Sequence, residues 1–422
     1  MLILADDLTG AADCGLACTE AGLETLVLLD PQGTVSGAEA LAVDLDSRGL
    51  QAVDAYAVTR SAAEWLLAPG TLFYKKIDST LRGNPAAEIA AACDAVAAGP
   101  HGRALALVAP AFPATGRITR GGRVLIHGVR LELTETWRRE GQGDPDLAAM
   151  LRTAGLTNRT VSLQTIRSGK LPDLLRKAAA GGVGALVCDA ETNADLACIA
   201  AAGRTLGPAV VWAGSAGLAR HLGALAAQDV GDQHGRSARA ATRRRGPVVA
   251  VVGSMAAVAH AQAAALARLP RHAAVAVTPG TLLAGPASPR WQAAERSLDA
   301  ALGVVGDHGI VVLSIGVEPA GDDAPGRLLS AVLARLAAPH MGRSGALIAT
   351  GGETARAVLG LTGVSGLRLV GEIEPGVPLA MAAGLPGTPL PVVTKAGAFG
   401  DEFTLIRCAE ALQALPFAPD RV

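Results

Sequence analysis

The chain has 422 residues, half of them hydrophobic, and a formal net charge of -1. This length exceeds one ordinary hydrophobic core, so two domains are expected. The near-neutral charge excludes a global basic surface for nucleic acid or anionic membranes, and an aromatic content of 3% disfavours base-stacking platforms.

Cysteine usage and the first residues indicate a cytoplasmic protein. The six cysteines include no C-x-x-C pair, which favours small buried hydrophobes over metal ligands or a disulfide. The chain opens with a strand and two aspartates, not with a basic and then apolar leader. No apolar run reaches the roughly 18 residues that a membrane-spanning helix needs. We therefore expect a cytoplasmic protein without nucleic-acid or membrane partners.

The first predicted strand, 2–4, leads to two adjacent aspartates, Asp6 and Asp7, before a predicted helix over 11–22. Paired carboxylates at a strand end suit magnesium coordination or the orientation of substrate hydroxyls. The alternative is an N-cap for the helix, which needs only one aspartate. The second aspartate therefore favours a functional site.

A strand–turn–helix unit over 71–98 carries the densest set of polar groups. Its strand leads to Asp78, two hydroxyls and Arg82 in a turn, and a helix follows from Ala86. Open α/β sheets bind ligands at such strand ends. Two lysines and Arg82 lie within eight residues, which favours an anionic ligand, because a guanidinium binds a carboxylate through two hydrogen bonds. The alternative is a strand edge with solvated lysines and a hydroxyl that caps the helix.

The α/β alternation continues through the rest of the first half. Further strands are predicted over 25–29, 40–44, 104–108, 161–163, 185–189 and 209–213, and further helices over 53–67 and 86–98. The strand over 40–44 is followed by a loop through Asp46, Ser47 and Arg48. Two prolines and a glycine fix the loop over 109–119 and place Arg117 where it could join Arg82.

Two segments after that loop have weaker signals. A β-ribbon is predicted over 121–133, with His127 as a turn or surface residue. Residues 228–247 change in composition and contain an arginine run, 243–245, before Gly-Pro. We expect an exposed interdomain linker with solvated arginines; a phosphate-binding patch is the alternative.

Small-residue loops follow three predicted strands of the second half. The strand over 248–252 ends in Gly253 and Ser254, before a helix over 255–269. The strand over 346–349 precedes the loop 350–354 and a helix over 355–361. The strand over 391–394 precedes the loop 395–402. Parallel strands would bring these loops to one edge, where glycine admits a ligand to the backbone and free helix amides bind phosphate. The loops favour a nucleotide phosphate site, although neither P-loop nor dinucleotide-fingerprint spacing is present.

With these motifs in order, nearly the whole chain resembles the four-carbon acid sugar kinases, which are ATP-dependent enzymes that act on threonate, erythronate and their oxo relatives. The motifs of the first half are 5–10 (ADDLTG), 75–84 (KKIDSTLRGN) and 109–113 (APAFP) with Gly116 and Arg117, and those of the second half are Gly253 with Ser254, 351–354 (GGET), 374–378 (EPGVP) and 395–400 (KAGAFG).

The resemblance implies an α/β protein of two domains, each a mainly parallel sheet flanked by helices, with the active site in the cleft between them. We expect a sugar-acid-binding domain over 1–228, a linker over 229–247 and a nucleotide-binding domain over 248–422. The implied ATP-binding residues are Ser254, Gly351, Gly352, Glu353, Thr354, Gly397 and Gly400.

Phosphoryl transfer depends on positioning and charge stabilisation, which leads to a hypothesis for the remaining roles. The expected substrate-binding residues are Asp6, Asp7, Lys75, Asp78, Arg82 and Arg117, with Arg82, joined by Arg117, on the carboxylate. The expected catalytic residues are Asp78 or Asp7 as the base for the terminal hydroxyl and Lys76 or Lys75 as the cation; only one of two adjacent lysines on a strand can face the site. Mg²⁺ is expected with ATP, and its protein ligands stay open, with Asp6 and Asp7 as candidates.

Two other classes of function remain as alternatives. A non-catalytic nucleotide or sugar-acid sensor would bind both ligands without forming ADP. A sugar-acid lyase or isomerase could use the same acids and arginine, but it would not need a phosphate-binding second domain. The alanine-rich helices also make a homodimer possible, and no segment identifies its interface.

Overall fold

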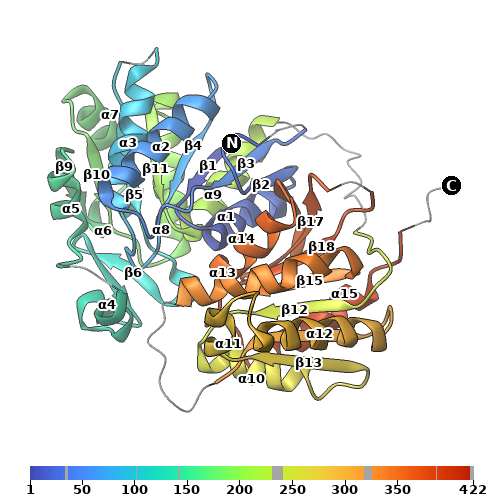
Figure 1. Cartoon of the computed structure of the whole chain (residues 1–422). Helices are drawn as coiled ribbons and strands as arrows, with labels where there is room; N and C mark the ends of the chain where they lie inside the picture. Colours follow the sequence, from blue (N-terminus) through green and yellow to red (C-terminus); the bar gives the residue numbers. More distant parts are fainter. Residues whose placement is uncertain are drawn as a thin grey trace. The chain divides into compact units, whose positions relative to one another are not determined.

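The computed structural model describes residues 1–33, 37–100, 102–140, 143–230, 241–317, 326–385 and 387–418. The chain divides into two compact units, Met1–His234 and Gly235–Val422 (Figure 1). Each unit is a mainly parallel β-sheet flanked by helices. The predicted α/β class is therefore confirmed.

The sheet of the first unit is entirely parallel, with strand order β2-β3-β1-β4-β11-β5-β10-β9. The strands are β1 (Leu2–Ala5), β2 (Thr25–Leu28), β3 (Ala40–Asp44), β4 (Phe73–Lys76), β5 (Leu105–Ala109), β9 (Asn158–Val161), β10 (Ala185–Cys188) and β11 (Val210–Gly214). Every residue of the central strands β1, β4, β5 and β11 is buried, as expected for a sheet covered on both faces.

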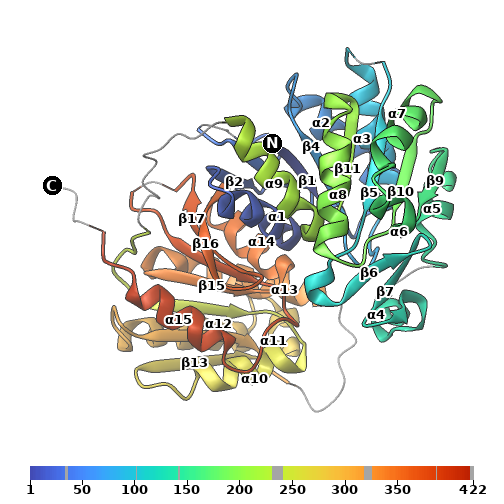
Figure 2. The same ribbon diagram turned by 180° about the vertical axis from the view of Figure 1, so that it is seen from behind.

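Helices cover both faces of this sheet. They are α1 (Leu8–Glu20), α2 (Ala52–Leu66), α3 (Pro85–Ala98), α4 (Glu135–Glu140), α5 (Leu147–Thr153), α6 (Leu163–Arg167), α7 (Leu171–Ala180), α8 (Asn193–Arg204) and α9 (Ala216–Val230). Helix α3 packs against α2 and α5, whereas α9 packs against α1 and α8 on the other face (Figures 1 and 2). These layers hold the carboxyl ends of β1, β3 and β4 together at one edge.

A three-stranded antiparallel ribbon follows β5 and consists of β6 (Arg117–Arg120), β7 (Arg123–Ile126) and β8 (Val129–Arg130). The ribbon starts earlier than the predicted 121–133, so Arg117 belongs to a strand and not to the preceding loop. His127 has a φ of 48° in the turn before β8, which confirms it as a turn residue. The backbone of Thr119 exchanges two hydrogen bonds with Ala190, and this fixes the ribbon on the main sheet.

The sheet of the second unit has the order β13-β14-β12-β15-β18-β17-β16, with β16 and β17 antiparallel at one edge. Its strands are β12 (Val248–Val252), β13 (His272–Val277), β14 (Ile310–Ile315), β15 (Ala346–Thr350), β16 (Gly366–Glu374), β17 (Val377–Ala383) and β18 (Pro391–Lys395). The helices are α10 (Ala257–Leu266), α11 (Pro279–Ala284), α12 (Pro289–Val304), α13 (Gly326–Ala337), α14 (Gly352–Leu361) and α15 (Thr404–Ala414).

The core of this unit lies between the sheet and the helix pair α10 and α15, which is seen in Figure 2. Valine and isoleucine side chains from β12, β14, β15 and β18 meet leucine and alanine side chains of the two helices there. Helices α13 and α14 pack together separately. Among the described helices, none is both long enough and apolar enough to cross a membrane.

Two predicted boundaries were wrong for local reasons. Helix α1 begins at Leu8, earlier than predicted, because Asp7 caps it. The strand predicted over 161–163 ends at Val161, because the hydroxyl of Ser162 accepts a hydrogen bond from the amide of Thr165 and starts α6.

The arginines of the 243–245 run are not uniformly solvated, contrary to expectation. Arg243 is fully buried: its guanidinium donates to the carbonyl of Asp307 at 3.0 Å and lies 4.3 Å from the ring centre of Phe417. Arg244 donates to two further carbonyl oxygens. Arg243 therefore joins the start of the second unit to its last described residues, and Arg244 joins it to the segment before β15. The preceding residues 231–240 of the expected linker lie outside the described ranges.

Candidate active site

The polar residues of the first unit gather at the carboxyl edge of its sheet. Ala5, the last residue of β1, pairs in register with Asp44 at the end of β3 and with Lys76 at the end of β4. The loops that follow these three strands therefore start side by side. They carry Asp6 and Asp7, the 46–48 loop, and the turn that begins at Asp78.

Arg48, to which the sequence analysis gave no role, connects these loops. Its guanidinium nitrogens lie 2.7 Å from a carboxylate oxygen of Asp6, 2.7 Å from one of Asp7 and 3.7 Å from one of Asp78. Asp7 also accepts a hydrogen bond from the amide of Gly10 at 2.9 Å, so the N-cap interpretation of Asp7 is confirmed alongside its ion pair. The only sequence signal for Arg48 was its place in a loop after a strand.

Asp78 and Arg82 form an ion pair within one turn. The Nε of Arg82 donates to Oδ2 of Asp78 at 3.0 Å, and Nη2 donates to Oδ1 at 3.1 Å. The backbone amide of Thr80 donates to Oδ2 at 3.1 Å, and its hydroxyl binds the same oxygen. Asp78 therefore shapes the turn that presents Arg82 and Ser79.

The two adjacent lysines point in opposite directions, as predicted for a strand. The Nζ of Lys76 lies 3.9 Å from Oδ1 of Asp6 and faces the carboxylates. Lys75 is fully buried: its Nζ lies 3.1 Å from a carboxylate oxygen of Glu88 and donates to the carbonyl of Leu4 at 3.1 Å. Lys75, one of the expected substrate-binding residues, is thus committed to the core and does not face the other site residues.

Arg117 lies beside the Asp78 turn and donates from Nη1 to the hydroxyl of Ser79 at 2.8 Å. Its Nε is buried and has no hydrogen-bond partner among the described residues. The orientation of Arg117 is fixed by two backbone hydrogen bonds to Phe112. A buried donor without a partner is costly, so an anion bound at this place would be stabilised.

The charges of the site favour ionised aspartates. Burial alone would raise the pKa of Asp6, but Arg48 and Lys76 outweigh burial and hold that pKa below its ordinary value. Arg82 and Arg48 likewise outweigh burial and hold the pKa of Asp78 well below its ordinary value. Burial lowers the pKa of Arg117. An added anion would favour its charged form, which supports this edge as an anion site.

In the second unit the three predicted loops converge, as expected for parallel strands. Thr350, at the end of β15, pairs in register with Val252 of β12 and Lys395 of β18. A Cβ on Gly397 would lie 2.6 Å from Cβ of Ser254, and one on Gly351 would lie 4.0 Å from the same atom. Glycine is therefore needed at 397 for the loops to approach so closely.

The loop after β15 presents the start of helix α14. Gly351 has a φ of 91°, which glycine adopts without strain, and its amide donates to the carbonyl of Lys395 at 2.7 Å. The hydroxyl of Thr354, in the first turn, is buried and without a partner among the described residues, and a Cβ on Gly253 would overlap it. Free helix amides and an unpartnered hydroxyl together suit a phosphate oxygen.

Lys395 holds the loop after β18 in shape. Its buried Nζ donates to the carbonyl oxygens of Ala396, Gly397 and Phe399 at 2.8, 3.3 and 2.8 Å. Gln262 of α10 donates to the carbonyl of Phe399 as well, at 3.0 Å. Lys395 therefore acts on the loop backbone and does not project from it.

Two of the expected ATP-binding residues lie at the margin of this convergence. Gly400 has a φ of 80°, and a Cβ at this position would overlap the side chain of Thr404 at the start of α15. Glu353 is exposed in the first turn of α14, with a carboxylate oxygen 3.9 Å from Arg327.

The described residues contain no group of three or more histidine, cysteine, aspartate or glutamate side chains that could hold a metal ion such as Mg²⁺. The carboxylates of Asp6, Asp7 and Asp78 each have a cationic neighbour within 4 Å. These three carboxylates are therefore poor candidates for metal ligands.

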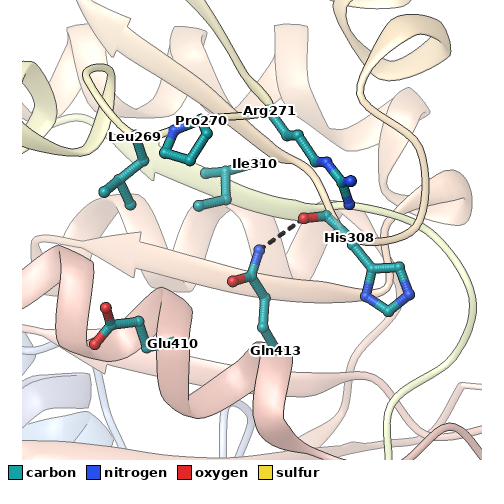
Figure 3. Close-up of a pocket in the computed structure, with 7 residues that line it drawn as sticks. All are labelled: Leu269, Pro270, Arg271, His308, Ile310, Glu410 and Gln413. Carbon is teal, nitrogen blue, oxygen red and sulfur yellow. Dashed lines mark hydrogen bonds between the residues drawn. The ribbon is translucent and has the colours of Figure 1, made fainter.

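A separate pocket lies at the opposite edge of the second sheet, where β13 and β14 begin (Figure 3). Figure 3 shows Gln413 of α15 donating to the carbonyl of His308, at 2.9 Å. The charged residues that line this pocket are exposed, and none of its lining side chains has a buried polar atom without a hydrogen-bond partner. The residues that line the pocket are Leu269, Pro270, Arg271, His308, Ile310, Glu410 and Gln413.

Comparison with known families gives two matching regions, one in each compact unit. Residues 1–222 match the model of a sugar-binding N-terminal domain, and residues 249–405 match that of a nucleotide-binding C-terminal domain. The first match contains the aspartate–arginine edge, and the second contains the three converging loops.

Similar proteins cover nearly the whole chain. A D-threonate kinase from Cupriavidus necator is 43% identical, with 97% of both chains covered, and one from Bordetella bronchiseptica is 39% identical, with 98% of both covered. Relatives named 3-oxo-tetronate kinase or D-erythronate kinase are 27–31% identical. A crystal structure of a Haemophilus influenzae protein has the same fold, with a TM-score of 0.75 at 21% identity over 97% of this chain and 99% of that one.

Proposed function

The chain belongs to the family of four-carbon acid sugar kinases, and we propose that it transfers the γ-phosphoryl group of ATP to the terminal hydroxyl of D-threonate. The observation that carries the choice of D-threonate is 43% identity to a D-threonate kinase over 97% of both chains. Relatives that act on other four-carbon acids are less similar, at 31% identity or below.

The anion site of the first unit would hold the substrate carboxylate. Arg117 has a buried Nε without a partner, and Ser79 offers a hydroxyl beside it. Arg82 flanks them, oriented by Asp78. Two guanidinium groups and a hydroxyl provide donors for both oxygens of a carboxylate.

Asp7 is the candidate base that the geometry favours. Its side chain is 23% exposed, compared with 10% for Asp78 and 2% for Asp6, so it is the most accessible of the three. Both oxygens of Asp78 accept hydrogen bonds from Arg82, which makes that carboxylate a weaker base. In the proposed step Asp7 takes the hydroxyl proton while the hydroxyl oxygen bonds to the γ-phosphorus and the bond to ADP breaks. The ammonium group of Lys76 would offset the negative charge that develops during the transfer.

The second unit would hold ATP at the three converging loops. The amide of Gly352, with the hydroxyls of Ser254 and Thr354, would bind phosphate oxygens, and Gly351 and Gly397 would admit them to the backbone, because neither has a side chain. The amide of Gly351 itself already donates to the carbonyl of Lys395. When bound with ATP, Mg²⁺ would neutralise charge on the phosphates. No protein ligand for Mg²⁺ is assigned.

The test is a coupled ADP-release assay with Mg²⁺ and ATP against D- and L-threonate, D- and L-erythronate and 3-oxo-tetronates. The expected result is ADP release that depends on the acid, with kcat/KM highest for D-threonate. A higher kcat/KM for another acid would replace D-threonate but keep the kinase. Binding of ATP and acid without ADP formation would identify a sensor, and conversion of the acid without ATP would identify a lyase or isomerase.

A further inference from the structure

We propose that Arg48 is a positioning residue for the acceptor site: it fixes Asp6 and Asp7 and leaves the substrate to other groups. This inference rests on the proposed function. The guanidinium of Arg48 lies 2.7 Å from both Asp6 and Asp7, through two different nitrogens. A third nitrogen lies 3.7 Å from Asp78. One side chain thus contacts carboxylates from two strand ends.

The loop that carries Arg48 is itself fixed to the end of β1. The backbone amides of Ser47 and Arg48 both donate to the carbonyl of Asp6, at 3.0 and 3.2 Å. The hydroxyl of Ser47 donates to Glu88, whose other carboxylate oxygen lies 3.1 Å from the buried Nζ of Lys75. Ser47, Glu88 and Lys75 are all buried.

Lys75 closes this network at the strand ends. Its Nζ also donates to the carbonyl of Leu4 in β1 at 3.1 Å and to that of Lys76 in β4 at 3.0 Å. The chain from Lys75 through Glu88 and Ser47 therefore ties the ends of β1 and β4 to the loop after β3. Ser47 connects this network to the acceptor site, both through the adjacent Arg48 and through its own amide bond to the carbonyl of Asp6.

The other side of Arg48 is covered by Gly83, which has a φ of 77°. A Cβ on Gly83 would lie 3.3 Å from Cα and Cγ of Arg48. The Arg48 stem is thus held between the loop backbone and the turn after Arg82. The side chain is 24% exposed, with its charge directed to the three aspartates.

The position of Asp7 depends on this arginine. Asp6 and Asp7 are adjacent carboxylates, and like charges so close repel each other unless a cation lies between them. Arg48 supplies that cation and binds one oxygen of each. Without it, Asp7 would keep its cap bond to Gly10 but lose the contact that fixes its second oxygen. A base displaced by about 1 Å can cost roughly 10²-fold in rate.

The experiment compares Arg48→Met and Arg48→Lys with wild type in the full chain. We expect Arg48→Met to lower kcat for D-threonate by roughly 10²-fold, while the Kd for D-threonate from calorimetry changes by less than about threefold. Arg48→Lys should restore part of kcat, since one ammonium group cannot reproduce the planar fork. Added guanidinium should raise kcat of Arg48→Met but not of wild type. The matched control is Arg60→Met, which removes an exposed arginine paired with Glu64 on α2.

Other results would overturn the inference. A Kd for D-threonate weakened tenfold or more would make Arg48 a substrate ligand, and an unchanged kcat would remove any role. If Arg48→Met does not fold, Ser47→Ala is the second variant, because it loosens the loop without removing charge; its kcat should fall at unchanged Kd, and an unchanged kcat would refute the proposal. If wild type releases no ADP with any acid, the proposed function has failed, and this is seen before any variant is compared.

Discussion

Asp7 and Asp78 carry the same carboxylate but have different partners. Asp78 gives both oxygens to Arg82 and Thr80, whereas Asp7 divides its oxygens between Arg48 and a helix amide. A carboxylate that accepts several charge-assisted hydrogen bonds is a poor proton acceptor. This difference in partners is the reason for which we propose Asp7 as the base and Asp78 as the residue that orients Arg82.

We predict that Asp7→Asn lowers kcat by roughly 10²-fold or more, because the amide cannot accept the hydroxyl proton. Asp78→Asn should mainly raise KM for the acid, because Arg82 loses its ion pair and its orientation. Steady-state kinetics with D-threonate at saturating ATP measure both effects. A large loss of kcat in Asp78→Asn with near wild-type turnover in Asp7→Asn would reverse the two roles.

The side-chain partners of the site residues come from other strands, loops and helices, and the local sequence does not encode them. The alternation of side chains on a strand predicted that only one of Lys75 and Lys76 faces the site. It could not predict which one, because that depends on Glu88 in the following helix. The role of Arg48 depends on three partners distant in sequence, and no local pattern encodes those contacts.

At the scale of elements, the loops after β12, β15 and β18 converge because their strands are parallel neighbours. This could be predicted from the order of strand, small-residue loop and helix. The antiparallel pair β16 and β17 was not predicted, although its turn lies in the 374–378 motif. Strand periodicity gives the face of a residue but does not give the direction of its neighbour.

Gly397→Ala tests the convergence directly. The added Cβ would lie 2.6 Å from Cβ of Ser254, so the two loops must separate. We expect KM for ATP to rise roughly tenfold with little change in the Kd for D-threonate. Gly360→Ala on α14 is the matched control, because a Cβ there meets nothing within 4 Å; it should leave KM for ATP unchanged. Equal kinetics for the two variants would contradict the loop assignment.

Lys395 should make the same loop sensitive to pH. Burial lowers its pKa to about 8, although the Cys408 side chain and the Glu374 carboxylate act in the opposite direction. Below that pH the ammonium donates to three carbonyl groups, and above it the amine has one donor fewer, so the loop should loosen as pH rises. We expect KM for ATP to increase as pH rises through about 8 in wild type but not in Lys395→Arg. A parallel increase in both proteins would assign the titration to another group.

At the scale of the molecule, length and motif order predicted two α/β units, each with its own polar edge. The arginine run beside the expected linker was misjudged, because composition suggests solvation whereas Arg243 is buried against Phe417 near the end of the chain. Contacts between segments this far apart in sequence have no local signal. The family motifs identified the loops, but the partners of each side chain came from the fold.

The division of ligands between the units leads to a prediction about coupling. The expected acid ligands belong to the first unit and the expected ATP loops to the second, so the groups that activate the nucleophile should reach the γ-phosphate only when the acid is bound, and bound acid should then exclude water. We predict that ADP release with Mg²⁺ and ATP alone is at least roughly 10²-fold slower than with D-threonate. Arg117→Met should bind the acid more weakly. At limiting D-threonate its rate of ADP release should therefore fall towards the rate seen without acid. In the absence of acid the variant should release ADP no faster than wild type. Rapid ATP hydrolysis without acid would mean that acid binding does not control access to the phosphate.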